Sequence, residues 1–232
     1  GTLVLGFLIL GQVMQSSGAT AFFSDISMAA IGQKRGGPAK VAIIGSSLMG
    51  TVSGSTVANL MSTGMVSIPL MKRNGFSGPM AAGIEAVASN GGQLAPPVMG
   101  ATAFIIAEYL ELPYATIVAA AALPALIYFV FLFCQVDYYA RDKGMSGLAK
   151  DQIPKMIDVL KNGWVFILPL MILIFFLFGL TYNPAKSALY ATLSLLVLSL
   201  LKYRTLPKVS TIYNAIILLG NPFALLVMIC AG

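Results

Sequence analysis

Two short segments of the chain gather side chains and backbone groups that could bind an ion or a small solute. The first is rich in hydroxyls and glycine, reads Thr51-Val52-Ser53-Gly54-Ser55-Thr56, and is followed one turn later by Asn59. The second reads Ser89-Asn90-Gly91-Gly92-Gln93-Leu94-Ala95-Pro96-Pro97. Hydroxyl, amide and free carbonyl oxygens can replace the water around Na⁺, and helix N-termini attract carboxylates. These segments therefore predict reversible binding of a cation and an organic anion.

Oxygens from both segments are assigned to a sodium site, and overlapping positions are assigned to the organic anion. The predicted sodium ligands are Ser53, Gly54, Ser55, Asn59, Ser89, Asn90 and Gly91. The predicted anion-binding residues are Ser55, Thr56, Gly92, Pro96 and Pro97. Small residues can instead serve only to let membrane helices pack closely. We prefer that interpretation for four further residues, Ser46, Ser47, Ser62 and Thr63.

Glu85 is a carboxylate deep in an apolar run, about one turn before the second segment. Charged groups inside a membrane are costly and are candidates for function by default. Glu85 could carry a coupling proton or orient the segment that follows it. It could equally be protonated and hydrogen-bonded, with no role in transport.

The elements that must position these residues are membrane helices. The 232 residues are 58% hydrophobic and 9% charged, whereas a soluble domain is about 25% charged. A membrane span needs about 20 apolar residues, and the runs nearest that length are Thr2–Ser16, Ser77–Ala107, Pro113–Val136, Trp164–Thr181, Ser187–Leu201 and Thr211–Ala231. The net charge of +6 does not indicate nucleic acid, because the basic residues are scattered between these runs. The expected surroundings are a lipid bilayer.

The basic residues also predict how the chain crosses the membrane, because lysine and arginine beside membrane helices mark the cytoplasmic side. All 14 of them except Lys186 fall into four clusters between the apolar runs. If these clusters share one face, Val41–Met71 must enter and leave on that face. One helix of this length would reach about 46 Å, whereas arms folded at Ser53-Gly54 reach about 18 and 25 Å and do not cross a core of about 30 Å. The sequence predicts a re-entrant helical hairpin; one long tilted helix is the alternative.

The run Ser77–Ala107 is predicted to be a broken helix. Proline lacks an N–H and clashes with the preceding turn, while glycine tolerates the φ values of unwound chain, so we expect two half-helices to meet at Asn90–Pro96. Irregular backbone at membrane depth persists only where protein buries it or where it lines a site. Between Gly18 and Gly32 the pattern predicts an interfacial helix along the cytoplasmic surface.

Several motifs occur in a fixed order along the chain. They are Gly32-Gln33-Lys34-Arg35-Gly36-Gly37, Gly50-Thr51-Val52-Ser53-Gly54-Ser55-Thr56-Val57-Ala58, Ile68-Pro69-Leu70-Met71-Lys72-Arg73-Asn74-Gly75, Ala82-Gly83-Ile84-Glu85-Ala86, Gly91-Gly92-Gln93-Leu94 and Ala95-Pro96-Pro97-Val98-Met99. This order resembles the large transmembrane, DctM-type subunit of TRAP transporters, where a hairpin with a Gly/Ser-rich tip precedes a broken helix that ends in a Pro-Pro pair. The stretch Ala88–Gly92 is most similar to the TAXI branch, in which small and large subunits are often fused. The resemblance is strong over Gly32–Gly100 and weak after Lys143.

The resemblance implies an all-α polytopic membrane protein with an elevator-type ion-transporter fold. It implies Na⁺-coupled uptake of small organic anions, such as carboxylates, across a bacterial or archaeal cytoplasmic (inner) membrane. The implied partners are a periplasmic substrate-binding protein and a small membrane subunit, separate or fused. Four parts are expected: a transmembrane helix and an interfacial arm helix (1–40), the hairpin and broken helix of the transport domain (41–107), a return helix and cytoplasmic linker (108–161), and scaffold helices with the start of a second repeat (162–232).

Other functions remain compatible with the same residues. An ion channel would form a static pore from the hairpin and the broken helix, and a proton-coupled carrier would use H⁺ in place of Na⁺. An enzyme is not expected, because the chain has no histidine and offers no plausible carboxylate pair or metal cluster. No cofactor is expected besides Na⁺ as coupling ion. Because the chain lacks an initial Met and carries one hairpin and one broken helix, we expect a fragment that does not transport alone.

Overall fold

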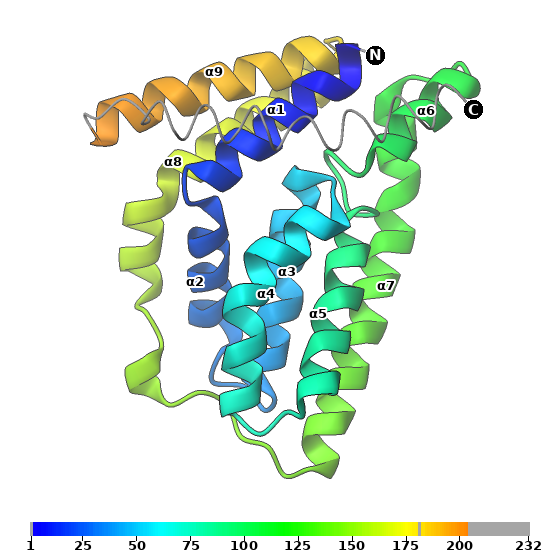
Figure 1. Ribbon diagram of the computed structural model, residues 1–232. Coiled ribbons are helices and arrows are strands. Elements are labelled where there is room, and N and C mark those ends of the chain that lie inside the picture. Colours follow the sequence, from blue (N-terminus) through cyan, green and yellow to red (C-terminus); the bar gives the residue numbers. More distant parts are fainter. Residues whose placement is uncertain (1, 181, 204–232) are drawn as a thin grey trace.

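Residues 2–180 and 182–203 are described by the computed structural model, and every regular element in these ranges is helical (Figure 1). The elements are α1 (Thr2–Ser16), α2 (Ala19–Ile31), α3 (Gly37–Ser53), α4 (Thr56–Arg73), α5 (Gly78–Gly92), α6 (Ala101–Tyr109), α7 (Tyr114–Asp142), a 3₁₀ turn η1 (Lys150–Gln152), α8 (Met156–Ile174), a π-helical turn η2 (Phe175–Gly179) and α9 (Pro184–Tyr203). The prediction of an all-helical chain is confirmed for these ranges. The predicted run Thr211–Ala231 lies outside the described residues.

Three described helical segments are long and apolar enough to cross a membrane, namely Tyr114–Asp142, Lys150–Gly179 and Pro184–Lys202. Many large apolar side chains of these segments are exposed, for example Leu123 and Phe131 of α7. A helix that exposes so much apolar surface is stable only where lipid or another protein covers it. These three segments are therefore candidate membrane spans.

Helix α8 begins at Met156, well before the predicted start at Trp164. The additional turns carry the charged residues Asp158 and Lys161 and therefore lie outside the apolar run from which the start was predicted. Val159 and Gly163 on these turns are nevertheless buried. The helix therefore extends beyond its apolar stretch because one face of the extension packs against the protein.

Figure 1 shows α2, α3, α4, α5 and α7 side by side, with α1 and α9 running across one end of them. Two apolar cores hold the assembly together. One lies between α3, α4, α5 and α7 and includes Ile43, Met71 and Val136. The other joins α1, α2, α8 and α9 to the adjoining ends of α3 and α7 and includes Leu10 and Phe166. The helices α3, α4 and α5 thus share an apolar core with α7.

Helix α2 packs along α3 and against α8, with Phe22 and Phe23 buried. The ring of Phe22 stacks on Phe166 of α8, with 5.6 Å between ring centroids. An added Cβ on Gly163 would collide with the Phe22 ring. The absence of a side chain at Gly163 is what lets α2 and α8 approach closely, a common use of glycine between membrane helices. Interfacial placement of α2 stays a prediction.

Asp137 of α7 links that helix to the start of α3. Its Oδ2 accepts from Arg35 and its Oδ1 accepts from Lys40, each at 2.5 Å. Lys40 is only 6% exposed in its side chain, and its ammonium also lies 4.9 Å from the centroid of the Phe133 ring. A buried ammonium needs such a partner, because an unpaired charge is strongly unfavourable away from water. Asp137 therefore fixes the start of α3 against α7.

Candidate functional site

The chain reverses direction between α3 and α4 at the two residues Gly54 and Ser55. Gly54 has φ of 60°, in the left-handed region that favours glycine, and a Cβ there would clash with the carbonyl oxygen of Met99. Ser55 then caps α4, because its Oγ accepts from the Ala58 N–H at 3.4 Å. Glycine is thus required at position 54 for two reasons, namely the left-handed backbone conformation and the close approach of the Met99 carbonyl.

Between α5 and α6, residues 93–100 leave the helical conformation and contain a cis peptide bond at Pro96-Pro97. The interruption begins later than predicted, because Asn90, Gly91 and Gly92 all belong to α5. The carbonyls of Asn90 and Gly91 accept from the Gln93 and Leu94 N–H groups. The expectation that the glycine pair itself is unwound is therefore wrong.

The two glycines instead allow close packing. A Cβ on Gly92 would lie 2.6 Å from the Cα of Gly50, and a Cβ on Gly91 would clash with the Tyr128 ring of α7. Real Cβ atoms do not approach other heavy atoms so closely. Gly91 and Gly92 are thus needed where the end of α5 meets α3 and α7.

The turn after α3 and the interruption after α5 lie against each other. The Val98 N–H donates to the Thr51 carbonyl at 3.2 Å, and Thr56 Oγ1 lies 3.4 Å from Asn90 Oδ1. Thr56 and Asn90 therefore meet at the surface of this junction, while Ser53 is buried beside the turn. The Gly50–Gly92 approach completes the same junction.

Tyr114 of α7 anchors the interrupted segment from its other side. Its hydroxyl lies 2.6 Å from the Val98 carbonyl and 3.0 Å from the Pro97 carbonyl. The one hydroxyl proton is shared between these two carbonyls, of which that of Val98 is the nearer. As a predicted anion-binding residue, Pro97 has no N–H to donate and can offer only its ring, and Pro96 beside it is half-buried.

Glu85 is 0% exposed and lies at the centre of a cluster of hydroxyl groups from three helices. Oε1 accepts from Ser46 of α3, from Thr63 of α4 at 2.5 Å and from Ser89 of its own helix at 3.3 Å. Oε2 accepts from Ser67 of α4 at 2.5 Å. A carboxylate has room for about four such donors. Glu85 therefore joins α3, α4 and α5 at one buried point, which we call the Glu85 cluster.

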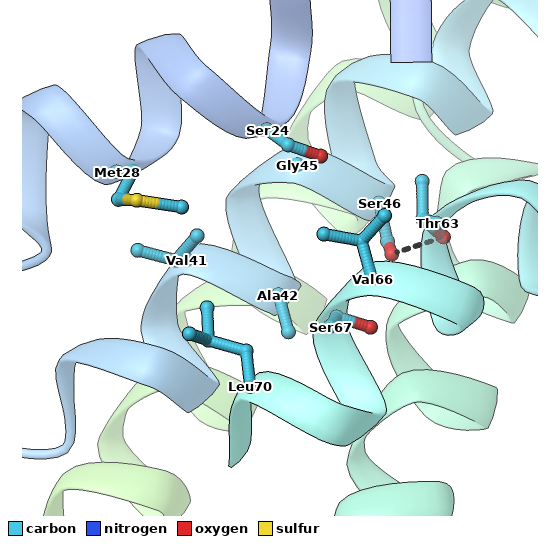
Figure 2. A pocket seen from close by; sticks show the side chains of 10 residues that line it. All are labelled: Ser24, Met28, Val41, Ala42, Gly45, Ser46, Thr63, Val66, Ser67 and Leu70. Atoms are coloured by element: carbon cyan, nitrogen blue, oxygen red, sulfur yellow. Dashed lines mark hydrogen bonds between the residues drawn. The ribbon is translucent and has the colours of Figure 1, made fainter. Parts of the chain in front are cut away.

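Figure 2 shows the side of this cluster that faces α2, where the hydroxyls of Ser46 and Thr63 lie 2.9 Å apart. A small cavity of about 10 Å³ adjoins them, bounded on the α2 side by Ser24 and Met28. That volume is close to the minimum that admits one water molecule. The Glu85 cluster is thus closely packed on this side rather than open to a large pocket.

Asn59 of α4 is also 0% exposed and is linked to the Glu85 cluster. Its Nδ2 donates to the Ser46 main-chain carbonyl at 2.8 Å, and its own main-chain carbonyl lies 2.7 Å from Thr63 Oγ1. Its Oδ1, however, has no hydrogen-bond partner among the residues that the structure describes. Buried polar atoms are nearly always paired with protein, water or an ion, so an unpaired acceptor marks a position that a donor or a cation would satisfy.

The structure brings the predicted sodium ligands together in two groups. Asn59 and Ser89 are buried in or next to the Glu85 cluster, whereas Ser53, Gly54, Ser55 and Asn90 lie around the turn and its contact with α5. Ser89 already donates to Glu85. Ser46 and Thr63, predicted only to allow close packing, thus donate to a buried carboxylate, and Ser67 was not predicted at all. The sequence does carry a signal for the α4 residues, because Asn59, Thr63 and Ser67 recur every four residues on one helical face.

Within the described residues, no group of three or more His, Cys, Asp or Glu side chains could hold a metal ion. The oxygens near Asn59 come instead from hydroxyls, an amide and main-chain carbonyls. Neutral oxygens of this kind, beside one carboxylate, suit a weakly bound monovalent cation better than a tightly held transition metal.

The fold and this site define a class, namely polytopic helical membrane proteins that bury a polar cluster where a turn between two helices meets an interrupted helix. The chain belongs to the family described as "Tripartite ATP-independent periplasmic transporter, DctM component", which matches residues 1–232. It is therefore a multi-pass protein of the cytoplasmic membrane and a large permease of the TRAP type. Because this is a family of transporter permeases, the expectation that the chain is not an enzyme is confirmed.

Three relatives illustrate the family. The C4-dicarboxylate TRAP transporter large permease protein DctM of Pseudomonas aeruginosa is 24% identical over 85% of this chain and 46% of its own length. The sialic acid TRAP transporter large permease protein SiaM of Vibrio cholerae is 24% identical over 86% of this chain and 46% of its own length. The 2,3-diketo-L-gulonate TRAP transporter large permease protein YiaN of Escherichia coli is 24% identical over 91% and 49%. The chain spans about half the length of the relatives it matches.

Proposed function

We propose that this chain belongs to a permease that takes up small organic anions by secondary transport coupled to Na⁺. The observation that carries the proposal is the unpartnered Oδ1 of buried Asn59 beside the junction of the α3–α4 turn with the interrupted helix. A cation with a small radius can satisfy that oxygen together with neighbouring hydroxyl and carbonyl oxygens. Because the chain belongs to the DctM family of transporter components, a cation bound at this site would accompany the transported solute.

The anion is a carboxylate in this proposal. The solutes named for the three relatives are a C4-dicarboxylate, sialic acid and 2,3-diketo-L-gulonate, and each carries at least one carboxyl group. Thr56 at the start of α4 and Asn90 lie together at the exposed side of the junction. The N-terminus of α4 supplies free N–H groups and partial positive charge there, which favour a carboxylate. The anion would approach Ser55 and Thr56 from this side.

Several finer features belong to the same proposal. The pair α3–α4 would enter and leave the membrane on one face as a re-entrant hairpin, and the helices α3 to α5 would move as the transport domain of an elevator. A periplasmic substrate-binding protein would deliver the anion, and a small membrane subunit would complete the scaffold. A TAXI-type subunit organisation, with small and large subunits fused, rests on the stretch Ala88–Gly92 alone.

The test uses the full-length permease, reconstituted in liposomes with its small subunit and binding protein. Tracer uptake of the anion should saturate, require the binding protein and depend on an inward Na⁺ gradient. Substituting Asn59→Ala should raise the Na⁺ concentration for half-maximal uptake by about tenfold, because one buried ligand to a charge is lost. The combination Ser53→Ala with Asn90→Ala should abolish the dependence of uptake on Na⁺.

Asn74→Ala is the matched control. Asn74 lies at the other end of α4, and its side chain donates to the Leu70 carbonyl of the same helix. It should leave the dependence on Na⁺ unchanged. Uptake that follows an H⁺ gradient and ignores Na⁺ would replace the sodium assignment with a proton-coupled carrier. Flux that neither saturates nor needs the binding protein would indicate the ion channel instead.

A further inference from the structure

Glu85 is the one buried carboxylate among the described residues that has hydroxyl partners on three helices. Such a group is costly to bury, and the hydrogen bonds offset that cost only while all of the donors stay in place. Lys40, the basic residue of α3, is paired with Asp137 of α7 and not with Glu85. The Lys72 and Arg73 side chains lie in the last turn of α4 and are exposed. Among the described contacts of Glu85, the partners are hydroxyls rather than cations.

The Glu85 cluster extends directly to Asn59. Ser46 donates to Glu85 through its hydroxyl and accepts from Asn59 Nδ2 through its carbonyl. Thr63 donates to Glu85 Oε1 and lies near only the main-chain carbonyl of Asn59, so it does not orient the Asn59 amide. An amide is planar, so fixing Nδ2 also fixes the position of Oδ1. Ser46 therefore connects the carboxylate of Glu85 to the orientation of the unpartnered oxygen.

We infer that Glu85 is a positioning residue for the cation site: by holding Ser46, whose main-chain carbonyl accepts from Asn59 Nδ2, it fixes the Asn59 amide so that the Oδ1 atom is ready for a cation. This inference rests on the proposed function, since it concerns the same sodium site. Glu85 does not itself touch the cation. Its effect is to preorganise a ligand, which strengthens binding because the site need not be ordered when the cation arrives.

The inference distinguishes partners of Glu85 that are otherwise alike. Ser46 contacts Glu85 through its hydroxyl and Asn59 Nδ2 through its main-chain carbonyl, whereas Ser67 donates to Glu85 Oε2 and has no described contact with Asn59. Both serines are buried. If Glu85 serves only to stabilise the fold, removing either hydroxyl should have similar consequences. If it positions Asn59, removal of the Ser46 hydroxyl should weaken sodium binding more.

The experiment measures the Na⁺ concentration for half-maximal uptake and the Na⁺-dependent increase in thermal stability, again in the full-length reconstituted permease. Glu85→Gln keeps the side-chain volume and should raise the half-maximal Na⁺ concentration about tenfold, the size expected for one lost hydrogen bond to a charged group. Ser46→Ala should act in the same direction, because it frees the α3 residue that holds Asn59 Nδ2. Ser67→Ala should have a smaller effect on this concentration. Ser27→Ala is the control, because Ser27 is buried on α2 and donates within its own helix to Phe23.

The outcomes separate this inference from the proposed function. Wild-type permease with no dependence on Na⁺ rejects both. Wild-type permease with Na⁺ dependence, together with a Glu85→Gln variant that loses stability or maximal rate but keeps its half-maximal Na⁺ concentration, rejects the positioning role alone. If Glu85→Gln does not fold, the comparison of Ser46→Ala with Ser67→Ala decides, and equal effects of the two on the half-maximal Na⁺ concentration overturn the inference.

Discussion

Gly50 of α3 and Gly92 of α5 meet so closely that a Cβ on Gly92 would lie 2.6 Å from the Cα of Gly50. The contact brings the last turn of α5 against α3 just before the turn at Gly54 and Ser55. Close approach of helix backbones through small residues is a general means of packing in membranes. Here it sets the distance between the helix turn and the interrupted helix, and therefore the geometry of the candidate site.

Replacing Gly92 by alanine should destabilise the protein by about 1–3 kcal/mol, because the added methyl group meets backbone atoms that cannot move aside. Gly83→Ala in the same helix is the matched control, since nothing lies within 4 Å of a Cβ there. That variant should be neutral or stabilising by up to about 1 kcal/mol, because alanine favours helix over glycine. Thermal unfolding of the two variants in detergent checks both expectations. Equal stability of the variants would contradict the close packing.

Tyr114→Phe should lower stability by about 1 kcal/mol, because the Pro97 and Val98 carbonyls lose their common hydroxyl donor. The interrupted segment should also become more accessible to protease or hydrogen exchange, while α3 and α4 remain protected. Tyr138→Phe is the comparison, because Tyr138 is exposed on the same helix. Exchange in residues 93–100 that is identical in both variants would argue against this anchor.

Asp137→Asn should lower stability markedly more than Asp142→Asn. Asp137 pairs with Arg35 and with nearly buried Lys40, so its neutralisation leaves the Lys40 ammonium with no full countercharge at a cost of about 1–3 kcal/mol. Asp142 is exposed and lies 3.8 Å from Lys143, an arrangement that contributes little. The thermal midpoints of the two variants, measured at the same salt concentration, test this difference. Equal midpoints of the two variants would show that the Asp137 pairs are only loosely formed surface contacts.

Gly163→Ala should weaken the packing of α8 on α2, because the new methyl group would overlap the ring of Phe22. Combining it with Phe22→Leu, which makes room beside α8, should recover part of the lost stability. The two substitutions are thus expected to be non-additive by about 0.5–3 kcal/mol, as residues in contact usually are. Additive effects in a double-mutant cycle would show that the two positions do not determine each other's packing.

Local chemistry was enough to predict where the chain turns and where a helix is interrupted. The reversal at Gly54 follows from a glycine-serine sequence next to a helix, and the interruption after α5 follows from Pro96-Pro97. Both effects act within a few residues and so are visible in the sequence. The same reasoning failed for Gly91 and Gly92, since a glycine that permits unwinding is indistinguishable in sequence from one that permits close packing.

The partners of Glu85 could not be predicted because they depend on how α3, α4 and α5 are arranged in space. Glu85 stands out in the sequence because it lies in an apolar run, whereas Ser46 and Thr63 resemble small residues that only allow helices to pack closely. Hydrogen-bond partners from other helices are a property of tertiary structure. The start of α8 was missed for a related reason, since its first turns are charged on one side and gain their burial from contact with α2.

The polar contacts are distributed unevenly between neighbouring helices. The Glu85 cluster lies wholly within α3, α4 and α5, whereas the neighbours α1 and α2 reach these helices through Gln15, which donates to the Ala58 carbonyl, and Thr20, which approaches the sulfur of Met49. Sulfur is a weak acceptor, and the rest of that boundary includes apolar side chains and the close approach of Gly11 to Val52. Sliding along such a boundary would break the Gln15 hydrogen bond and otherwise exchange non-directional contacts for others, while the buried Glu85 carboxylate would keep all of its described donors.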